Sequence, residues 1–340
     1  MRAPRPRAAV AAVALVTALL ATGCGPVIAQ RNTFESAPLP AISEQGVAAA
    51  LAAVDAVTNQ ANAARDPELL GTVEAGPLLT ISTALYAYDS QVDPDNATPE
   101  TPVGHLAPTS FVPRFAGYPQ WFVTAAPWRD GEPGRLEVLT RDSSAAGWTV
   151  LIAPELLAGV DFPTLALDDE QYVVPLTAAQ LAALPTAVDA LATLLAQALT
   201  TGKAEGLGAG LLADAWTKSR RDADAAAAKT VGAAATVAAT YAVGESLPEA
   251  LRTQDGGALV WYSLTETLVY TVAPNYFLQL DEATAKIVGT AQVTGTLTET
   301  SAGQLAVYVP PTASGTARIV AARWDRTGLT AAAAATPPPA

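Results

Sequence analysis

The 340 residues of this chain include only one cysteine, Cys24, and only one histidine, His105. A single thiol cannot close a disulfide within the chain, so stability must come from packing. A single histidine excludes a zinc site built on several histidines, and a Ser-His-Asp triad would have to use His105 itself. Because this residue lies in a polar loop between Gly104 and Leu106, we expect a solvated side chain. We predict neither a metal site nor a cofactor.

Residues 1–24 combine a cationic start, an apolar run and the cysteine. Three arginines precede the apolar residues 8–20, which are too few to span a bilayer as a helix. The small residues 21–23 then lead directly to Cys24, an order typical of a bacterial lipoprotein signal. We therefore predict that residues 1–23 are removed and that acyl chains on Cys24 anchor the protein at the extracytoplasmic face of the cell membrane.

Basic residues are scarce in the predicted mature chain. Three of the 19 lysines and arginines lie in residues 1–23, which leaves 16 basic against 32 acidic residues and a net charge of −16. An acidic chain without a basic stripe argues against nucleic acid as a partner. It also argues against electrostatic adhesion to anionic lipid, so the predicted lipid on Cys24 has to provide the membrane contact.

Helical patterns dominate the start of the mature chain. Residues 24–42 contain prolines and show no period, which predicts a tether. Ser43 is placed to cap a first helix, Asp66 caps a short second one, and Gly76 begins a third. Residues 90–109 are predicted to form a loop whose acidic residues lack the spacing of a calcium-binding EF-hand.

Short β-branched and aromatic runs come next, and they are typical of an antiparallel meander. These runs lie at residues 111–115, 121–126, 135–141 and 148–152. Charged and apolar side chains largely alternate in residues 135–141, which predicts a strand with one face in water. Glu137 shares that face with Arg135 and Arg141, so we expect it to point to solvent.

The order of helices followed by strands recurs in the second half. Thr177 and Gln180 have capping-box spacing, and helices are expected up to residue 202 and from about residue 211 to 224. Residues 206–210 between them are predicted to be a loop. Strand-like segments follow at residues 237–243, 258–272, 290–300, 304–309 and 317–324.

These patterns predict an α+β fold in which helices precede a sheet twice. We divide the mature chain into a first domain at residues 43–160 and a second at residues 170–328. Residues 329–340 are rich in alanine and proline and are predicted to form a disordered tail.

Three turn-and-strand segments resemble an uncharacterised family of actinobacterial lipoproteins. They are AGYPQWFV at residues 116–123, the hairpin that reaches Trp148 and the Ala-Pro pair at residues 153–154, and QDGGALV at residues 254–260. The resemblance covers most of residues 40–325. It implies two tandem cone-like domains of the NTF2-like or cystatin-like kind, each with helices followed by a curved antiparallel sheet. It implies no catalytic residue.

Four aromatic residues on or beside the predicted strands are the remaining site candidates, and they are Trp121, Trp148, Trp261 and Tyr262. A cone-shaped sheet encloses either a packed core or a pocket. Aromatic side chains bury large areas and dominate cores, so we expect packing, with a pocket lining in one domain as the alternative.

The absence of a nucleophile with a base favours a non-catalytic envelope lipoprotein that acts as a binding or assembly module. Its partner would be an envelope protein or a small apolar ligand. One alternative is a carrier of a small apolar ligand in a pocket lined by the tryptophans. Another is an enzyme that uses a buried carboxylate, Glu137 or Glu266, in an NTF2-like pocket. Arg220 and Arg221 beside two aspartates predict a solvated helix face.

Overall fold

The structure is a computed structural model that describes residues 37–98, 101–184, 188–312 and 315–333. The predicted signal peptide, Cys24 and the tether up to residue 36 lie outside the described residues. The described residues from Pro38 onward belong to one compact unit.

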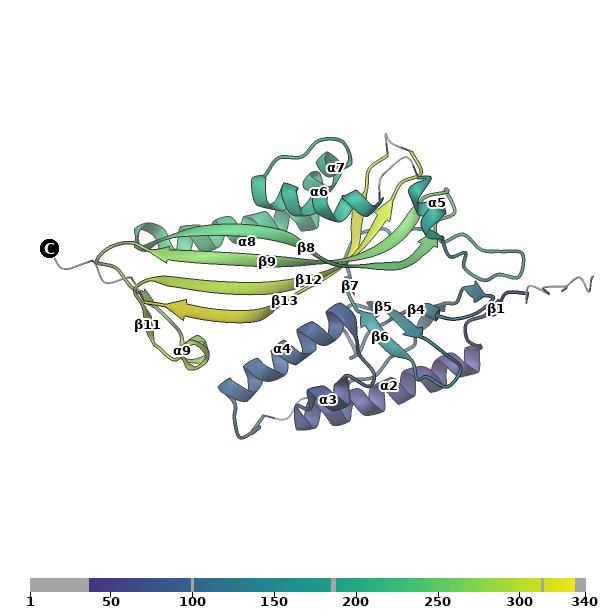
Figure 1. Cartoon of the computed structure of the whole chain (residues 1–340), viewed down its shortest axis with the longest axis horizontal. Coiled ribbons are helices and arrows are strands. Elements are labelled where there is room, and N and C mark those ends of the chain that lie inside the picture. The colour runs from purple at the N-terminus through teal and green to yellow at the C-terminus, as the bar shows by residue number, and fades with distance from the viewer. Residues whose placement is uncertain (1–36, 99–100, 185–187, 313–314, 334–340) are drawn as a thin grey trace, which may run out of the picture. The chain divides into compact units, whose positions relative to one another are not determined.

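The elements of this unit are shown in Figure 1. The helices are α2 (Glu44–Ala64), α3 (Pro67–Leu70), α4 (Gly76–Val92), α5 (Ala178–Ala182), α6 (Val188–Thr201), α7 (Leu207–Ala213), α8 (Ala215–Val231) and α9 (Glu282–Val288). The strands are β1 (Leu39–Pro40), β2 (Thr109–Phe111), β3 (Arg114–Phe115), β4 (Gln120–Ala126), β5 (Arg135–Arg141), β6 (Thr149–Ile152), β7 (Glu155–Leu156), β8 (Ala235–Arg252), β9 (Ala258–Val272), β10 (Leu278–Gln279), β11 (Gln292–Val293), β12 (Thr296–Val309) and β13 (Arg318–Ala332).

The predicted helix starts of the first half are confirmed. The Ser43 hydroxyl accepts a hydrogen bond from the Gly46 amide, which caps α2, and the Asp66 carboxylate caps α3. Helix α4 begins at Gly76 with proline in its first turn. Val47 and Leu51 lie on the buried face of α2 and pack with residues of α3, α4 and strands β4 to β6. The helices α2 to α4 therefore form one layer against this part of the sheet.

Nine of the described strands build a large, strongly curled antiparallel sheet in the order β2-β4-β5-β7-β13-β12-β9-β8, with β6 paired to β5. The pairs β1-β3 and β10-β11 form two small separate sheets. The long strands of the large sheet separate two packed faces, because successive side chains on a strand point to opposite sides. Tyr262 packs toward α6 and α7, whereas the neighbouring Trp261 packs into the core on the other face. On β13, Trp324 contacts Trp216 of α8, and Arg323 lies in a pocket with residues of α4.

Three local expectations are wrong. Residues 206–210 are not a loop, since α7 begins at Leu207, and the single helix expected up to residue 224 is two helices. Asp214 ends α7 and caps α8 by accepting a hydrogen bond from the Trp216 amide. Strands expected to be separate near residue 300 form the continuous strand β12. Position 303 lies within β12 and needs a glycine, because a Cβ there would lie 1.8 Å from Cζ3 of Trp324. This glycine interrupts the strand-like pattern in the sequence.

The fold class is α+β, as the sequence indicates, with helices packed on a strongly curled antiparallel sheet. Strands of both halves join in one sheet, because β7 pairs with β5 and with β13. The division into residues 43–160 and 170–328, and the NTF2-like or cystatin-like arrangement, stay predictions. Strand β13 continues to Ala332, into the segment assigned to the tail, and residues 334–340 lie outside the described part of the chain.

Candidate functional site

The four candidate aromatic residues do not line one common pocket. Trp121 and Trp261 are 6% and 0% exposed and lie in the same core cluster. Tyr262 packs on the opposite face of the sheet, where its hydroxyl donates to the Val188 carbonyl at 2.7 Å. Trp148 is half-buried against the first helical layer. Burial places Trp121 and Trp261 in the core, whereas Tyr262 also borders a pocket.

Glu137 is fully buried, so its predicted position in water is wrong. Its carboxylate accepts hydrogen bonds from Nε1 of Trp128 at 2.6 Å and from Nε2 of His105 at 2.7 Å. Charged and apolar residues do alternate in β5, but His105 and Trp128 cover the carboxylate of Glu137. A strand pattern gives the period of the side chains and does not show which face is covered.

His105 is buried between two carboxylates, so the expected solvated loop histidine is also wrong. Its side chain is 2% exposed, and its ring nitrogens contact Asp55 at 2.6 Å and Glu137 at 2.7 Å. Burial disfavours the charged ring, but the hydrogen bonds to Asp55 and Glu137 outweigh it and raise the pKa of His105 to about 10. The ring is therefore protonated at neutral pH and donates from both nitrogens. It fixes the loop at residues 101–108 to α2 and β5.

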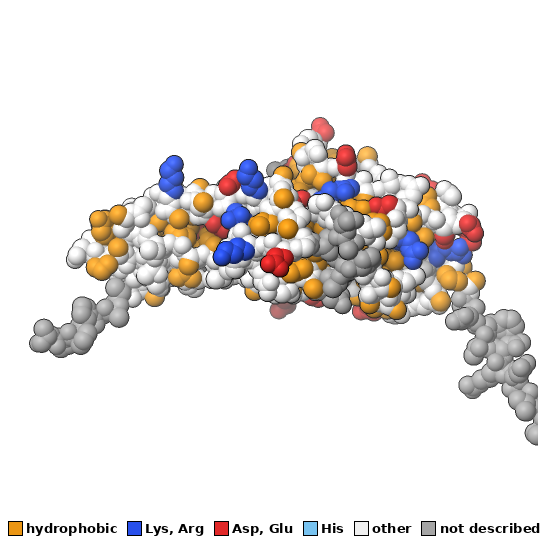
Figure 2. Space-filling view, turned by 90° about the horizontal axis from the view of Figure 1, so that it is seen from above, with side chains coloured by type: hydrophobic (Ala, Val, Ile, Leu, Met, Phe, Trp, Pro, Cys, Tyr) orange, Lys and Arg blue, Asp and Glu red, His pale blue; other side chains and the backbone are white. Residues whose placement is uncertain are grey.

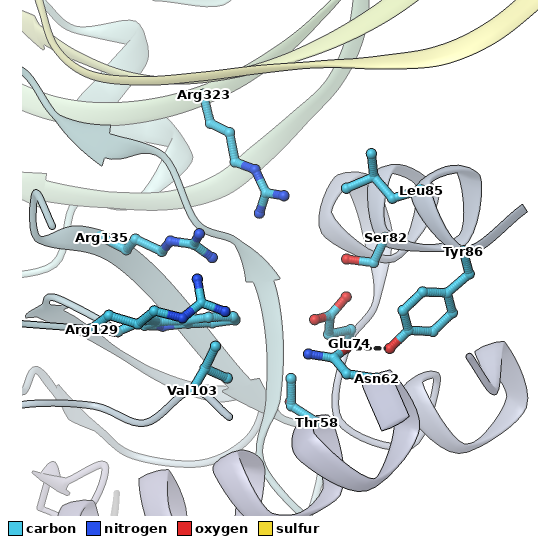
Figure 3. A pocket seen from close by; sticks show the side chains of 11 residues that line it. Thr58, Asn62, Glu74, Ser82, Leu85, Tyr86, Val103, Arg129, Arg135 and Arg323 are labelled. Atoms are coloured by element: carbon cyan, nitrogen blue, oxygen red, sulfur yellow. Dashed lines mark hydrogen bonds between the residues drawn. The ribbon is translucent and has the colours of Figure 1, made fainter. Parts of the chain in front are cut away.

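A pocket of about 130 Å³ opens beside this buried triad, between the first helical layer and strands β5 and β13 (Figure 3). Eleven residues line it: Thr58, Asn62, Glu74, Ser82, Leu85, Tyr86, Val103, Trp128, Arg129, Arg135 and Arg323. Sequence positions more than 200 residues apart meet here, because β13 lies next to the strands of the first half.

Glu74 is the acid inside this pocket, and the sequence analysis missed it. It lies between α3 and α4 and bridges to Val150 of β6, which holds its backbone in place. The residue is 3% exposed, and its Oε2 atom has no hydrogen-bond partner among the described residues. Burial raises the pKa of Glu74 to about 7, while a hydrogen bond with Ser82 and the charge of Arg323 oppose the shift.

Three arginines form the opposite side of the pocket. The Arg135 guanidinium lies over the Trp128 ring, 4.0 Å from its centroid. Burial, and then the nearby charge of Arg323, lower the pKa of Arg135. Each arginine has an acidic partner: Arg129 with Glu132 at 3.2 Å, Arg135 with Glu155 at 3.6 Å, and Arg323 with Asp325 at 2.6 Å. Within the described residues, no arginine lies within 4.0 Å of the Glu74 carboxylate.

The chemistry of this pocket is that of a binding site for a small polar molecule. Hydrogen-bond donors of the arginines face one buried carboxyl group that ionises near neutral pH. The sequence signal for it was weak: Glu74 stands between the small or apolar residues Val73 and Ala75, just before the Gly-Pro start of a helix. Residues in the turn before a helix usually lie at the surface, so only the fold shows that Glu74 is buried and that arginines meet it there.

Glu266, which the sequence left undecided, lies in a second buried cluster on the α8 face of the sheet. Its carboxylate accepts two hydrogen bonds from Arg220 at 2.9 Å and one from Trp324 Nε1 at 3.0 Å. The Tyr241 hydroxyl also contacts this carboxylate. Arg221 and Asp222 are exposed, as the predicted solvated helix face requires, whereas Arg220 is half-buried and pairs with Glu266. Figure 2 shows basic and acidic side chains interspersed on the face of the molecule that carries α6, α7 and α8.

Two further features concern metals and membranes. In the part of the chain that the structure describes, no cluster of three or more potential His, Cys, Asp or Glu ligands could hold a metal ion. Asp93, from the acidic loop, pairs with Arg65 and accepts hydrogen bonds from the amides of Ala97 and Thr98.

Among the described helices, none has the length and apolar character needed to cross a bilayer.

The chain matches the family model described as a domain of unknown function, DUF8094, over residues 38–331. It is 27% identical to an uncharacterised lipoprotein of Streptomyces avermitilis, over 90% of this chain and 89% of the relative. Two uncharacterised lipoproteins of Streptomyces coelicolor are 27% and 29% identical, over 75% and 78% of this chain and 75% and 77% of the relatives. No solved structure shows significant similarity to the chain.

Proposed function

The chain belongs to the DUF8094 family, and we propose that it is a lipid-anchored protein of the cell envelope that binds a small anionic molecule without transforming it. The observation that carries the binding proposal is the pocket of about 130 Å³ in which Arg135 and Arg323 face Glu74 without pairing with it. The predicted lipid site at Cys24 and the lipoprotein names of the relatives support the anchor.

The arrangement of the arginines supports an anion as the ligand. Arg135 and Arg323 are 14% and 13% exposed, so their charges are only partly screened by water. Guanidinium groups bind carboxylate or phosphate through paired, charge-assisted hydrogen bonds. A negative ligand between the two groups would offset their mutual repulsion. An apolar ligand would bring no acceptor for the guanidinium groups and would place apolar surface against two charged groups.

Binding without chemistry is supported by the state of the nearby histidine. Both ring nitrogens of His105 are engaged, with Asp55 and Glu137, and the raised pKa keeps the ring protonated. His105 is therefore unavailable as a general base for a serine or threonine hydroxyl in the pocket. The expectation of an envelope protein as a further partner stays a prediction.

Calorimetry with simple anions tests this proposal. The detergent-solubilised protein is titrated with phosphate, sulfate, acetate and propionate. We expect at least one to bind, and Arg323→Gln to weaken that binding about tenfold or more, since each charge-assisted hydrogen bond is strong. Arg221→Gln on the exposed face of α8 is the matched control and should bind as the wild type does. Four blank titrations, or equal weakening in both variants, would contradict the proposal.

A second candidate function has its own observation. A pocket of about 440 Å³ lies between α5, α6 and strands β8 and β9, and it contains the predicted site residue Tyr262. Leu181, Val188, Leu247 and Val260 give it an apolar lining, which suits the carrier of a small apolar ligand. Decanoate titrated against wild type and Leu247→Gln tests this function. Binding that the substitution abolishes supports the carrier, and the absence of wild-type binding refutes it.

A further inference from the structure

The pocket around Glu74 has two walls of opposite chemical character. Arg129, Arg135 and Arg323 come from the strands and the loop after β4, and Figure 3 shows their guanidinium groups pointing toward the carboxylate. Glu74 and Ser82 lie on the opposite, helical wall. Donors therefore face an acceptor across the space that a ligand would fill.

The helical wall has an acceptor that no described protein group satisfies. Glu74 is 3% exposed, and its Oε2 atom lacks a hydrogen-bond donor among the described residues. Buried polar atoms in folded proteins nearly always have a partner, so an unpaired one bordering a pocket points to a ligand group. An ammonium group, or another strong donor at this end of the ligand, would supply the hydrogen bond that Oε2 of Glu74 lacks.

The strand wall holds two neighbouring positive charges, and a negative ligand group would stabilise them. The charge of Arg323 contributes to the lowered pKa of Arg135, which shows that the two cations disfavour each other. Within the described residues Glu74 forms no ion pair with either arginine at 4.0 Å or less. The pocket thus separates the carboxylate from the cations. A ligand with a negative group at one end and a positive group at the other would satisfy both walls.

We propose that the ligand of this pocket is a small zwitterion, with its carboxylate between Arg135 and Arg323 and its ammonium group donating to Glu74. This inference rests on the proposed anion-binding function and deepens it. A volume of about 130 Å³ equals that of about four water molecules at roughly 30 Å³ each. Such a space suits an unsubstituted amino acid of the size of glycine, β-alanine or 4-aminobutyrate.

Glu74 makes a zwitterion distinguishable from a plain anion. A plain anion brings a second negative charge toward the carboxylate and leaves Oε2 unpaired. A zwitterion places its own positive charge there. The affinity ratio of an ω-amino acid to the matching fatty acid anion therefore reports on Glu74, whereas the affinity of the anion itself reports on the arginines.

The experiment is a calorimetric comparison of matched compounds on the full, detergent-solubilised protein. Glycine, β-alanine and 4-aminobutyrate are compared with acetate, propionate and butyrate at pH 8. We expect at least one amino acid to bind about tenfold tighter than its partner anion, a difference of about 1.4 kcal/mol. Glu74→Gln should remove this preference and leave the anion affinity unchanged or higher. Glu282→Gln, at an exposed position in α9, is the matched control and should keep the preference.

A pH series on the wild type gives a second readout that needs no variant to fold. The groups facing Glu74 are Arg135 and Glu137 on β5, Arg323 on β13, Arg129 after β4, and Ser82 and Tyr86 on α4, while α2 contributes the uncharged Thr58 and Asn62. Amino acid affinity should rise between pH 6 and 8 as Glu74 ionises, and propionate affinity should fall.

The outcomes separate the two proposals. Equal affinities for the amino acids and their partner anions, with parallel pH dependence, overturn the zwitterion and leave the anion-binding function standing. A preference that survives in a folded Glu74→Gln variant also overturns it. If neither class of compound binds to folded protein but phosphate or sulfate does, the zwitterion is overturned and the anion-binding function stands. If none of these compounds binds, both fail.

Discussion

Raising the pH should destabilise this fold through the one buried histidine ring. His105 lies between Asp55 and Glu137, and the hydrogen bonds to these carboxylates outweigh burial and raise its pKa from 6.5 to about 10. In the unfolded chain the ring regains its ordinary pKa near 6.5. Between these two values the folded protein holds a proton that the unfolded chain releases, so stability falls as the pH rises.

The magnitude follows from proton linkage. A difference of one bound proton changes the free energy of unfolding by about 1.4 kcal/mol per pH unit. The contribution of His105 is fully present below pH 6.5 and is lost as the pH rises through about 10. Between pH 7.5 and 9.5 we expect a loss of about 2.5 kcal/mol, which is large against the roughly 5–15 kcal/mol that stabilise a typical domain.

Urea unfolding followed by circular dichroism at pH 7.5, 8.5 and 9.5 measures this loss. The matched variant is His105→Gln, which should be about 3–5 kcal/mol less stable at pH 7.5, because the buried carboxylates of Asp55 and Glu137 lose their cation. Its stability should be nearly constant over the range, since the chain has no other histidine. Constant wild-type stability, or the same slope in the variant, would refute the reasoning.

Three further predictions concern the anchor, the core and the second buried cluster. Cys24→Ala should release the protein from the membrane fraction or leave it unprocessed, and firm retention of a processed variant would contradict the anchor. Trp261→Ala should cost about 3–5 kcal/mol in urea unfolding, because the ring is fully buried; a loss below about 1 kcal/mol would contradict core packing. Arg220→Ala should cost about 3–5 kcal/mol by leaving Glu266 buried without its cation. The exposed Arg221→Ala should change stability by less than about 0.5 kcal/mol, and similar losses in both variants would contradict the assigned contacts.

Local signals in the sequence predicted much of the secondary structure. Ser43, Asp66 and Thr177 cap helices where their spacing indicates, because a cap depends on side chains within one turn of the backbone it satisfies. The strand at residues 258–272 also begins and ends as predicted. These features need no information from distant parts of the chain.

The buried charges could not be predicted in the same way. The sequence alone leaves His105 in a polar loop, and its burial depends on Asp55 and Glu137, which lie 50 and 32 positions away. Glu74 joins Arg323 only after the two halves share one sheet. Such contacts arise from tertiary packing. The local sequence pattern therefore placed His105 and Glu137 in solvent and gave no reason to select Glu74.

A crystal structure of the protein with a bound ω-amino acid tests the central claim most directly. The account predicts the ligand in the pocket of about 130 Å³, with its carboxylate within hydrogen-bond distance of Arg135 and Arg323 and its amine beside Glu74. A ligand found elsewhere, or Glu74 paired directly with Arg323 across a closed pocket, would contradict it.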